Sequence, residues 1–292
     1  MDSTNHAFFA PCPRGLEAVL ADELTDLGAA DVKPTAGGVA FHGPLTLCYR
    51  VNLQSRIASR ILLRIAEGSY RDEHDVYDAA NAIRWQDWFT PQQRIKVKVS
   101  AHHCPLKSLD FVTLRVKDAV CDRFQFARGK RPTVDTHAPD ILIAVYLDAS
   151  TCTFYVDTSG EPLFKRGWRR SAGEAPIREN LAAGILRLSK WTADTVLYDP
   201  MCGSGTFVIE AALMARRVAP GIGRHFAFEK LLSFDAQRLN DLRTELKAME
   251  IPIKPGLIHA ADDNAHAMTS IKANLTIAGS GTNLYIGGGI FY

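Results

Sequence analysis

The chain has 292 residues, of which 47% are hydrophobic and 23% are charged, with a formal net charge of +2. This composition is typical of a folded globular protein of about two domains. The near balance of charge excludes a uniformly basic surface, so any contact with nucleic acid must come from a local patch. No run of about eighteen apolar residues occurs, so we expect a cytoplasmic protein with no export signal and no membrane partner.

Six cysteines occur singly, at positions 12, 48, 104, 121, 152 and 202. None of them has the paired spacing of a zinc site or a redox dithiol. We therefore predict no metal site and expect reduced, partly buried thiols.

Hydrophobic residues in the first 160 positions alternate between helical and strand spacing. Leucines at positions 16, 20, 24 and 27 predict a helix, and the Gly37-Gly38 pair opens a short alternating strand. Further strands are predicted near residues 61–65, 94–100, 141–147 and 153–157, and further helices near residues 47–53 and 109–120. This part of the chain is therefore predicted to be α+β.

Basic residues gather in three segments, at 94–100, 107–131 and 164–170. The strand at 94–100 alternates strictly, so its three cations share the face opposite Ile95, Val97 and Val99. A solvated edge strand and a phosphate-contacting strand both fit that pattern. The linker at 164–170 is basic and aromatic, which suits RNA contact or an ordinary domain connector. The candidate RNA contacts are Arg94, Lys96, Lys98, Lys107, Arg115, Lys117, Arg128, Lys130, Arg131, Arg166 and Arg169.

The pattern changes after residue 175 to alternating helices and strands. Pro176 fits the first turn of a helix, with Glu179 near its positive end. The buried stripe of this helix is predicted to contain Leu181, Ile185 and Leu188.

A glycine loop follows the next strand. Residues 195–198 predict a short buried strand that runs into Asp199-Pro-Met-Cys-Gly-Ser-Gly-Thr206 and then a helix. Gly203 and Gly205 allow a sharp turn and close approach to a ligand, and the helix start offers unpaired N–H groups. Val208 stands where a dinucleotide fingerprint needs a third glycine, and no P-loop lysine is present, so the spacing disfavours NAD and ATP.

A second apolar strand pattern at 257–262 ends in Asp262. In a parallel sheet its carboxylate would lie beside the glycine loop, where it could bind a diol. The alternative is a turn or helix cap at Asp262, and Asp263 and Asn264 are also plausible caps.

The glycine loop and its helix, Asp199 to Ala212, closely resemble motif I of the bacterial THUMP-containing 23S rRNA guanine-N2 methyltransferases. The segments 176–182, 224–229 and 262–279 are similar to other motifs of that family in order and spacing. The front half resembles it at residues 13–17, 116–120, 157–160 and 165–168.

The resemblance implies an α+β amino-terminal half, with a ferredoxin-like piece at 1–65 and a THUMP RNA-binding domain at 66–160. An α/β Rossmann-like class I methyltransferase domain that binds S-adenosylmethionine would follow at 161–292. Cys202 has no base near it in sequence, so we interpret it as a packing residue rather than a nucleophile. The candidate cofactor-site residues are Pro176, Glu179, Asn180, Asp199, Cys202, Gly203, Ser204, Gly205, Thr206, Asp262 and Asn264.

The activity implied by the resemblance is methyl transfer to a guanine N2 of 23S rRNA, with tRNA guanine as the nearest variant. The family holds the guanine with an Asn/Asp-Pro-Pro-Tyr/Phe motif, and this sequence contains no Pro-Pro pair, so catalytic residues are unknown. The family continues through more strands after the position of Gly279. We therefore expect an incomplete sheet that self-associates or is completed by another chain, and the alternative function is an inactive RNA-binding module.

Overall fold

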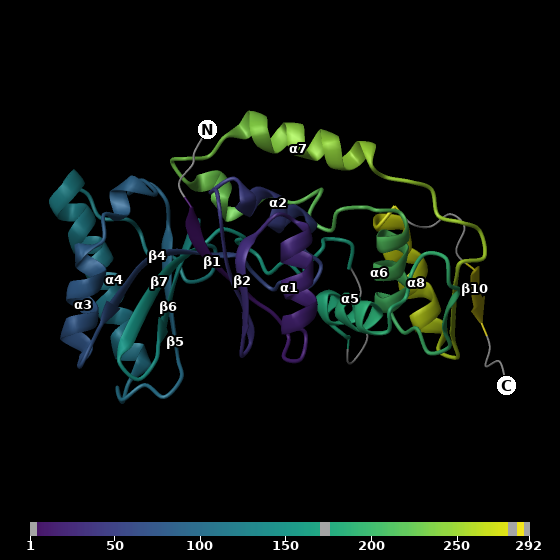
Figure 1. Cartoon of the computed structure of the whole chain (residues 1–292), viewed down its shortest axis with the longest axis horizontal. Coiled ribbons are helices and arrows are strands. Elements are labelled where there is room, and N and C mark those ends of the chain that lie inside the picture. Colours follow the sequence, from purple (N-terminus) through teal and green to yellow (C-terminus); the bar gives the residue numbers. More distant parts are fainter. Residues whose placement is uncertain (1–4, 170–175, 280–284, 289–292) are drawn as a thin grey trace.

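The computed structural model describes residues 5–169, 176–279 and 285–288. Two sheets lie toward opposite ends of an elongated molecule (Figure 1). The sequence segments 170–175, 280–284 and 289–292, which include part of the basic linker, lie outside the described residues. Within the described residues, no helix is long and apolar enough to cross a membrane.

The amino-terminal half is built on a seven-stranded sheet with the order β2-β3-β1-β4-β7-β6-β5. All neighbouring pairs are antiparallel except β5 and β6. The predicted boundary between residues 65 and 66 falls inside β4, which pairs with β1 on one side and β7 on the other. The strands are β1 His6–Pro11, β2 Ala30–Thr35, β3 Gly38–Gly43, β4 Leu62–Ser69, β5 Ile95–Ala101, β6 Ile141–Leu147 and β7 Thr151–Asp157.

Helices cover this sheet through the apolar stripes that the sequence predicts. In α4 the side chains of Val112, Val116 and Val120 are fully buried, and β5 is an edge strand with Ile95 and Val97 buried, so both predictions are confirmed. The strands β1 and β2 and the helix α3 were not predicted. The helices are α1 Glu17–Asp26, α2 Leu47–Gln54, α3 Glu73–Ala82 and α4 Leu109–Arg128, with a short 3-10 turn, η1, at Trp85–Asp87.

The carboxyl-terminal half contains a parallel three-stranded sheet with the order β10-β9-β8. The prediction of a buried first strand is wrong, because Val196 is 61% and Tyr198 47% exposed. The physical reason is that β8 pairs only with β9 among the described strands. The elements are β8 Leu197–Asp199, β9 Ile258–Asp262, β10 Tyr285–Gly288, α5 Glu179–Leu188, α6 Thr206–Ala215 and α8 Ala265–Ile277.

Helix α5 buries a different face from the one predicted. Pro176 is exposed and precedes the helix, and Ile185 and Leu188 are exposed too. The buried face carries small residues, and a Cβ on Gly184 would lie 2.3 Å from Leu16 Cδ1. Because α5 packs closely against the amino-terminal half, its buried face carries small side chains rather than the predicted stripe.

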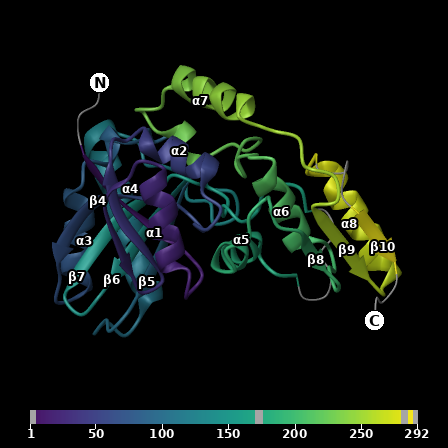
Figure 2. The same cartoon turned by 45° about the vertical axis from the view of Figure 1, so that its right-hand side comes forward.

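The segment between α6 and β9 returns to the amino-terminal half. It contains the 3-10 turn η2 Ala227–Lys230 and the helix α7 Ala236–Ala248, which lies beside α2 in both cartoon views (Figures 1 and 2). The rings of Tyr49 and Phe228 stack with centroids 4.4 Å apart, and the N–H of Phe228 donates to the carbonyl of Thr158 at 2.9 Å. Side chains from both halves thus join in one hydrophobic core.

Candidate cofactor site and RNA-binding surface

The glycine loop connects β8 to α6, as predicted. Gly203 has φ 53° and Gly205 has φ 85°, a left-handed conformation that favours glycine. A Cβ on Gly205 would lie 2.5 Å from Ile271 Cγ1, so α8 packs against the loop at this point. Gly205 is also the N-cap of α6, which places the free N–H groups of that helix directly after the turn.

Asp262 lies beside this loop at the end of β9. Its Oδ2 accepts a hydrogen bond from the N–H of Gly203 at 2.8 Å, and its Oδ1 accepts from the N–H of Asn264 at 2.9 Å. The side chain of Asn264, not that of Asp262, caps α8 by accepting from the N–H groups at 266 and 267. Each Asp262 oxygen retains a lone pair for a further donor.

Asp199, at the end of β8, adds a second carboxyl group. Burial raises the pKa of Asp199, and the neighbouring Asp262 raises it further. Burial also raises the pKa of the Cys202 thiol to about 12. The thiol is therefore neutral near pH 7, and the interpretation of Cys202 as a packing residue agrees with this protonation state.

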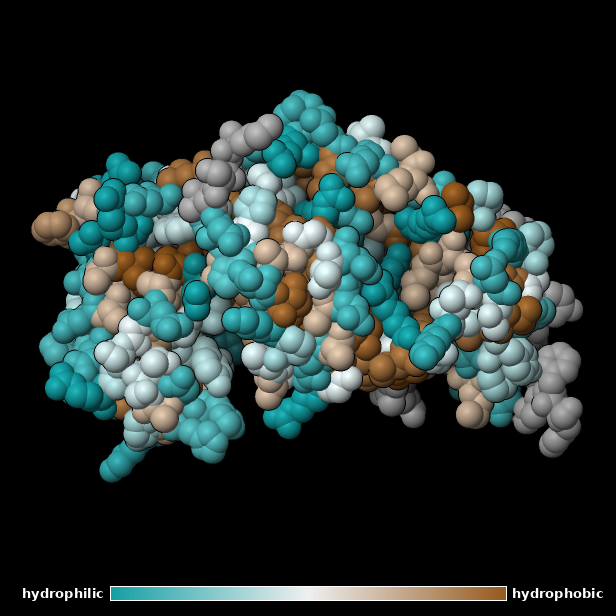
Figure 3. Space-filling view, viewed as in Figure 1, coloured by the Kyte–Doolittle hydropathy of each residue, from teal (hydrophilic) through white to brown (hydrophobic). Residues whose placement is uncertain are grey.

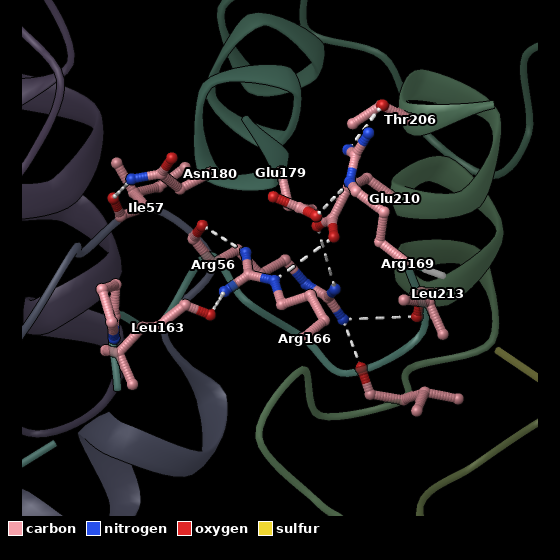
Figure 4. A network of polar contacts seen from close by, with 12 residues as sticks. Arg56, Ile57, Leu163, Arg166, Arg169, Glu179, Asn180, Thr206, Glu210 and Leu213 are labelled. Atoms are coloured by element: carbon pink, nitrogen blue, oxygen red, sulfur yellow. Dashed lines mark hydrogen bonds and ion pairs between the residues drawn. The ribbon is translucent and has the colours of Figure 1, made fainter. Parts of the chain in front are cut away.

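Arg169 lies beneath the glycine loop, which corrects its assignment to an RNA-facing surface (Figure 4). Its Nε donates to Glu179 Oε1 at 2.8 Å, and its Nη1 donates to Ser204 Oγ at 3.1 Å. Its Nη2 donates to Thr206 Oγ1 at 2.8 Å and to the carbonyl of Ile177 at 3.0 Å. The side chains of Glu179, Ser204 and Thr206 therefore support the loop. A cofactor contact through the backbone groups of these residues stays a prediction.

Arg166 is also wrong as an RNA contact, because only 2% of its side chain is exposed. Its Nε donates to Glu210 Oε1 at 3.3 Å, and its other nitrogens donate to the carbonyls of Leu163 and Arg56 (Figure 4). Arg56 Nη1 lies 4.0 Å from the second oxygen of Glu210. Burial lowers the pKa of Arg56 to about 10. This cluster joins the amino-terminal half, the linker and α6.

Asn180 belongs to the same junction. Its side chain is fully buried, and its Nδ2 donates to the carbonyl of Ile57 at 3.2 Å and to Ser59 Oγ at 3.1 Å. These contacts direct its amide nitrogen to the amino-terminal half, and its place in the cofactor pocket stays a prediction. The exposed Pro176 and the capping Asn264 remain predicted cofactor contacts.

Most of the predicted RNA-binding cations outside the linker already have polar partners. Arg94 pairs with Asp135 and Asp140, Lys117 with Asp118, and Arg131 with Asp122. Lys96 donates to the carbonyl of Thr136, and the Arg115 guanidinium lies 4.3 Å from the centroid of the Tyr77 ring. In the described part of the chain, the predicted cations without an ion pair or hydrogen bond are Lys98, Lys107, Arg128 and Lys130.

These four cations do not form one patch. Lys98 projects from the face of the sheet opposite α4, since Ile95 and Val97 bury the other face. Lys107 precedes α4 and Arg128 ends it, about 30 Å apart for a 20-residue helix.

The carboxyl end of α4 is the strongest candidate RNA surface, and sequence reasoning missed one of its residues. Phe126 lies in the last turn of α4, two residues before Arg128, and is 86% exposed, and the Arg123 guanidinium lies 6.0 Å from its ring centroid. The signal was present in the sequence, because the apolar stripe continues from Val120 to Phe124 and leaves Phe126 outside it.

Three family models match the chain in the order that the resemblance implies. Residues 7–62 match the RlmL ferredoxin-like domain, residues 70–157 the THUMP domain, and residues 166–286 the RMKL-like methyltransferase domain. A "Putative RNA methyltransferase" from Synechocystis is 36% identical over 273 residues, covering 93% of this chain and 71% of the relative. The chain belongs to the THUMP-containing RlmL-like methyltransferase family. The predicted fold class is thereby confirmed.

Other relatives of this chain are longer than the Synechocystis protein. The "Ribosomal RNA large subunit methyltransferase K/L" of Cellvibrio japonicus is 42% identical over 233 residues, which cover 78% of this chain and 31% of the relative. The chain thus spans about a third of that relative's length. The crystal structure of "SMU.472, a putative methyltransferase complexed with SAH" superposes with a TM-score of 0.89 at 28% identity, covering 98% of this chain and 76% of that chain.

Proposed function

We propose that this chain forms the cofactor-binding and RNA-binding part of an S-adenosylmethionine-dependent methyltransferase that acts on a guanine N2 of 23S rRNA. The observation that carries the proposal is the hydrogen bond from Gly203 N–H to Asp262, which closes the glycine loop at the carboxyl ends of β8 and β9. Ligands of open α/β sheets bind at this edge. The same chain matches a THUMP domain, whose presence supports an RNA substrate.

The residues of the loop fit S-adenosylmethionine chemically. The cofactor supplies a methyl group on a positively charged sulfur. Asp262 can accept hydrogen bonds from the ribose hydroxyls with its remaining lone pairs. Burial raises the pKa of Asp199, and a cationic ligand beside it would favour its ionised form. Gly203 and Gly205 leave the backbone open to close approach.

The RNA would be held by the carboxyl end of α4. Arg128 and Lys130 can contact phosphates, and the exposed ring of Phe126 can stack on an unpaired base. A guanine must leave its helix or lie in a loop before its exocyclic amine can reach the cofactor. The two surfaces therefore suit an enzyme that holds structured RNA at one place and an unpaired base at another.

A second candidate function is RNA binding without catalysis. The observation that favours it for these 292 residues is that they contain no Pro-Pro pair, since the resembled family holds guanine with an Asn/Asp-Pro-Pro-Tyr/Phe motif. Cofactor binding and RNA binding would then persist without methyl transfer.

The two candidates separate in one experiment with the 292-residue chain. Calorimetric titration with S-adenosylmethionine comes first, followed by transfer of a labelled methyl group to 23S rRNA and to tRNA. Saturable binding with label on guanine N2 of 23S rRNA supports the enzyme, and label only on tRNA would redirect the substrate. A shift of RNA mobility with no label would support the binding module.

A further inference from the structure

We propose that Arg169 is a positioning residue that sets the shape of the glycine loop, so that the linker after the THUMP half controls cofactor affinity. Its guanidinium reaches four acceptors, of which two are the hydroxyls of Ser204 and Thr206 on either side of Gly205. Among the described residues, no other side chain bonds to either hydroxyl. The identity of the ligand rests on the proposed function, whereas the contacts of Arg169 are observed independently of it.

The electrostatic setting shows that this contact is built into the fold. The start of α6 carries a partial positive charge, which disfavours a cation at that position. Glu179 offsets this effect, because its carboxylate lies 2.8 Å from Arg169 Nε with only 6% of its side chain exposed. Glu179 is itself the first residue of α5, where a helix favours an anion. The ion pair thus bridges the first turns of two helices and is screened from solvent.

Only an arginine fits the four acceptors. A guanidinium presents five N–H donors in a planar fork, whereas a lysine ammonium is a single point charge with three donors. All three guanidinium nitrogens donate: Nε to the carboxylate of Glu179, Nη1 to the hydroxyl of Ser204, and Nη2 to the carbonyl of Ile177 and the hydroxyl of Thr206. A lysine would keep the charge and lose the simultaneous contacts to both sides of Gly205.

The loop has separate restraints on its other side, so the contribution of Arg169 can be isolated. Asn274 Nδ2 donates to the carbonyl of Ser204 at 3.1 Å, and Asp262 accepts from the N–H of Gly203 at 2.8 Å. These contacts hold the backbone next to α8 and β9. Loss of Arg169 should therefore loosen the hydroxyl side of the loop while the fold persists.

The test compares wild-type protein with Arg169→Gln and Arg169→Lys, using S-adenosylhomocysteine as the probe in calorimetry. We expect both variants to bind about tenfold more weakly, which corresponds to about 1.4 kcal/mol. The matched control is Arg243→Gln: that side chain is 21% exposed and also has a glutamate partner, Glu229, but it lies in α7 and does not contact the loop. The control should keep wild-type affinity.

Amide hydrogen exchange at residues 202–207 provides a readout that needs no ligand. We expect exchange there to become about tenfold faster in Arg169→Gln and to stay unchanged in Arg243→Gln. Thr206→Val should weaken binding by less than Arg169→Gln, and the double variant should lose less affinity than the sum, because one shared contact is removed twice.

The outcomes separate the two proposals. Unchanged exchange and affinity in Arg169→Gln would overturn the positioning role, and so would an equal loss in Arg243→Gln, which indicates general destabilisation. If the wild-type protein does not bind the probe, the proposed cofactor is wrong, and exchange at residues 202–207 still decides the role of Arg169.

Discussion

The two sheets of the molecule are stabilised in different ways. In the seven-stranded sheet, alternate residues of the strand β6, such as Ile141 and Ile143, are fully buried beneath the helices. In the three-stranded sheet, Val196 and Tyr198 around β8 are exposed, and apolar side chains reach the surface over α6 and α8 (Figure 3). The first sheet packs into a large core that side chains from the carboxyl-terminal half also join, whereas the second leaves its β8 edge uncovered within the described residues.

Polar contacts between the two halves of the chain stabilise the carboxyl-terminal half, whose sheet is less well covered. The carboxyl-terminal half is attached through the buried Arg56, Arg166 and Glu210, and through Asn180, which donates to the amino-terminal half. Hydrophobic packing tolerates small changes in position, whereas hydrogen bonds have narrow geometry. The position of the cofactor loop thus depends on a few charged groups at the junction.

The largest expected effect comes from removing the buried carboxylate. Glu210→Gln removes the counter-charge that Arg56 and Arg166 share in a site where the Glu210 side chain is 0% exposed. We expect a loss of about 3 to 5 kcal/mol in the free energy of unfolding, measured in urea. Glu245→Gln, which breaks the exposed pair with Arg50, should cost no more than about 1 kcal/mol. Equal losses in the two variants would contradict the role of the junction.

The β8 edge, which the described residues leave uncovered, predicts self-association of the 292-residue chain. Val196→Lys places a charge next to β8, and we expect it to weaken association by about 1.5 to 3 kcal/mol if copies bury Val196 against one another. Sedimentation velocity over a concentration series measures this shift toward monomer. Leu232→Lys changes a similarly exposed side chain in the segment between α6 and β9 that packs on the amino-terminal half, and it serves as the control. A wild-type protein that stays monomeric at all concentrations would exclude pairing at this edge.

A substitution at Asp262 tests whether the three-stranded sheet binds the cofactor. Asp262→Ala removes the acceptor of Gly203 N–H and of the proposed ribose hydroxyls, so we expect a loss of roughly 1 to 3 kcal/mol in cofactor affinity by calorimetry. Asp263→Ala removes the adjacent exposed carboxylate and should bind as the wild-type protein does. Unaltered affinity in Asp262→Ala would leave that residue with its structural contacts to Gly203 and Asn264 alone.

The smallest expected effect is on RNA affinity measured at a single salt concentration. The dependence of that affinity on salt concentration is therefore the better measurement. Replacing both Arg128 and Lys130 with Gln should reduce the dependence of log K on log salt by about two units, one for each lost phosphate contact. Replacing Arg94 and Arg131 should change the slope less, because aspartates already neutralise their charges. Equal slopes in both variants would mean that RNA binds elsewhere.

Local physical rules explain which features the sequence could predict. The stripe of α4 and the alternation of β5 follow from helix and strand periods, and both were confirmed. The buried face of α5 was mispredicted, because close packing of Gly184 on Leu16 overrides the leucine pattern. Strands β1 and β2 were missed because their sequences, HAFFAP and ADVKPT, lack clear alternation.

The sequence by itself determined the glycine loop and the acidic residue beside it. Two closely spaced glycines and a strand ending in aspartate suffice, since backbone sterics and parallel pairing bring Gly203 and Asp262 together. Only the tertiary structure decided the roles of Arg166 and Arg169. An arginine in a basic linker has the same local pattern whether it meets RNA or a buried carboxylate. Its environment depends on partners distant in sequence, such as Glu210, 44 residues beyond Arg166.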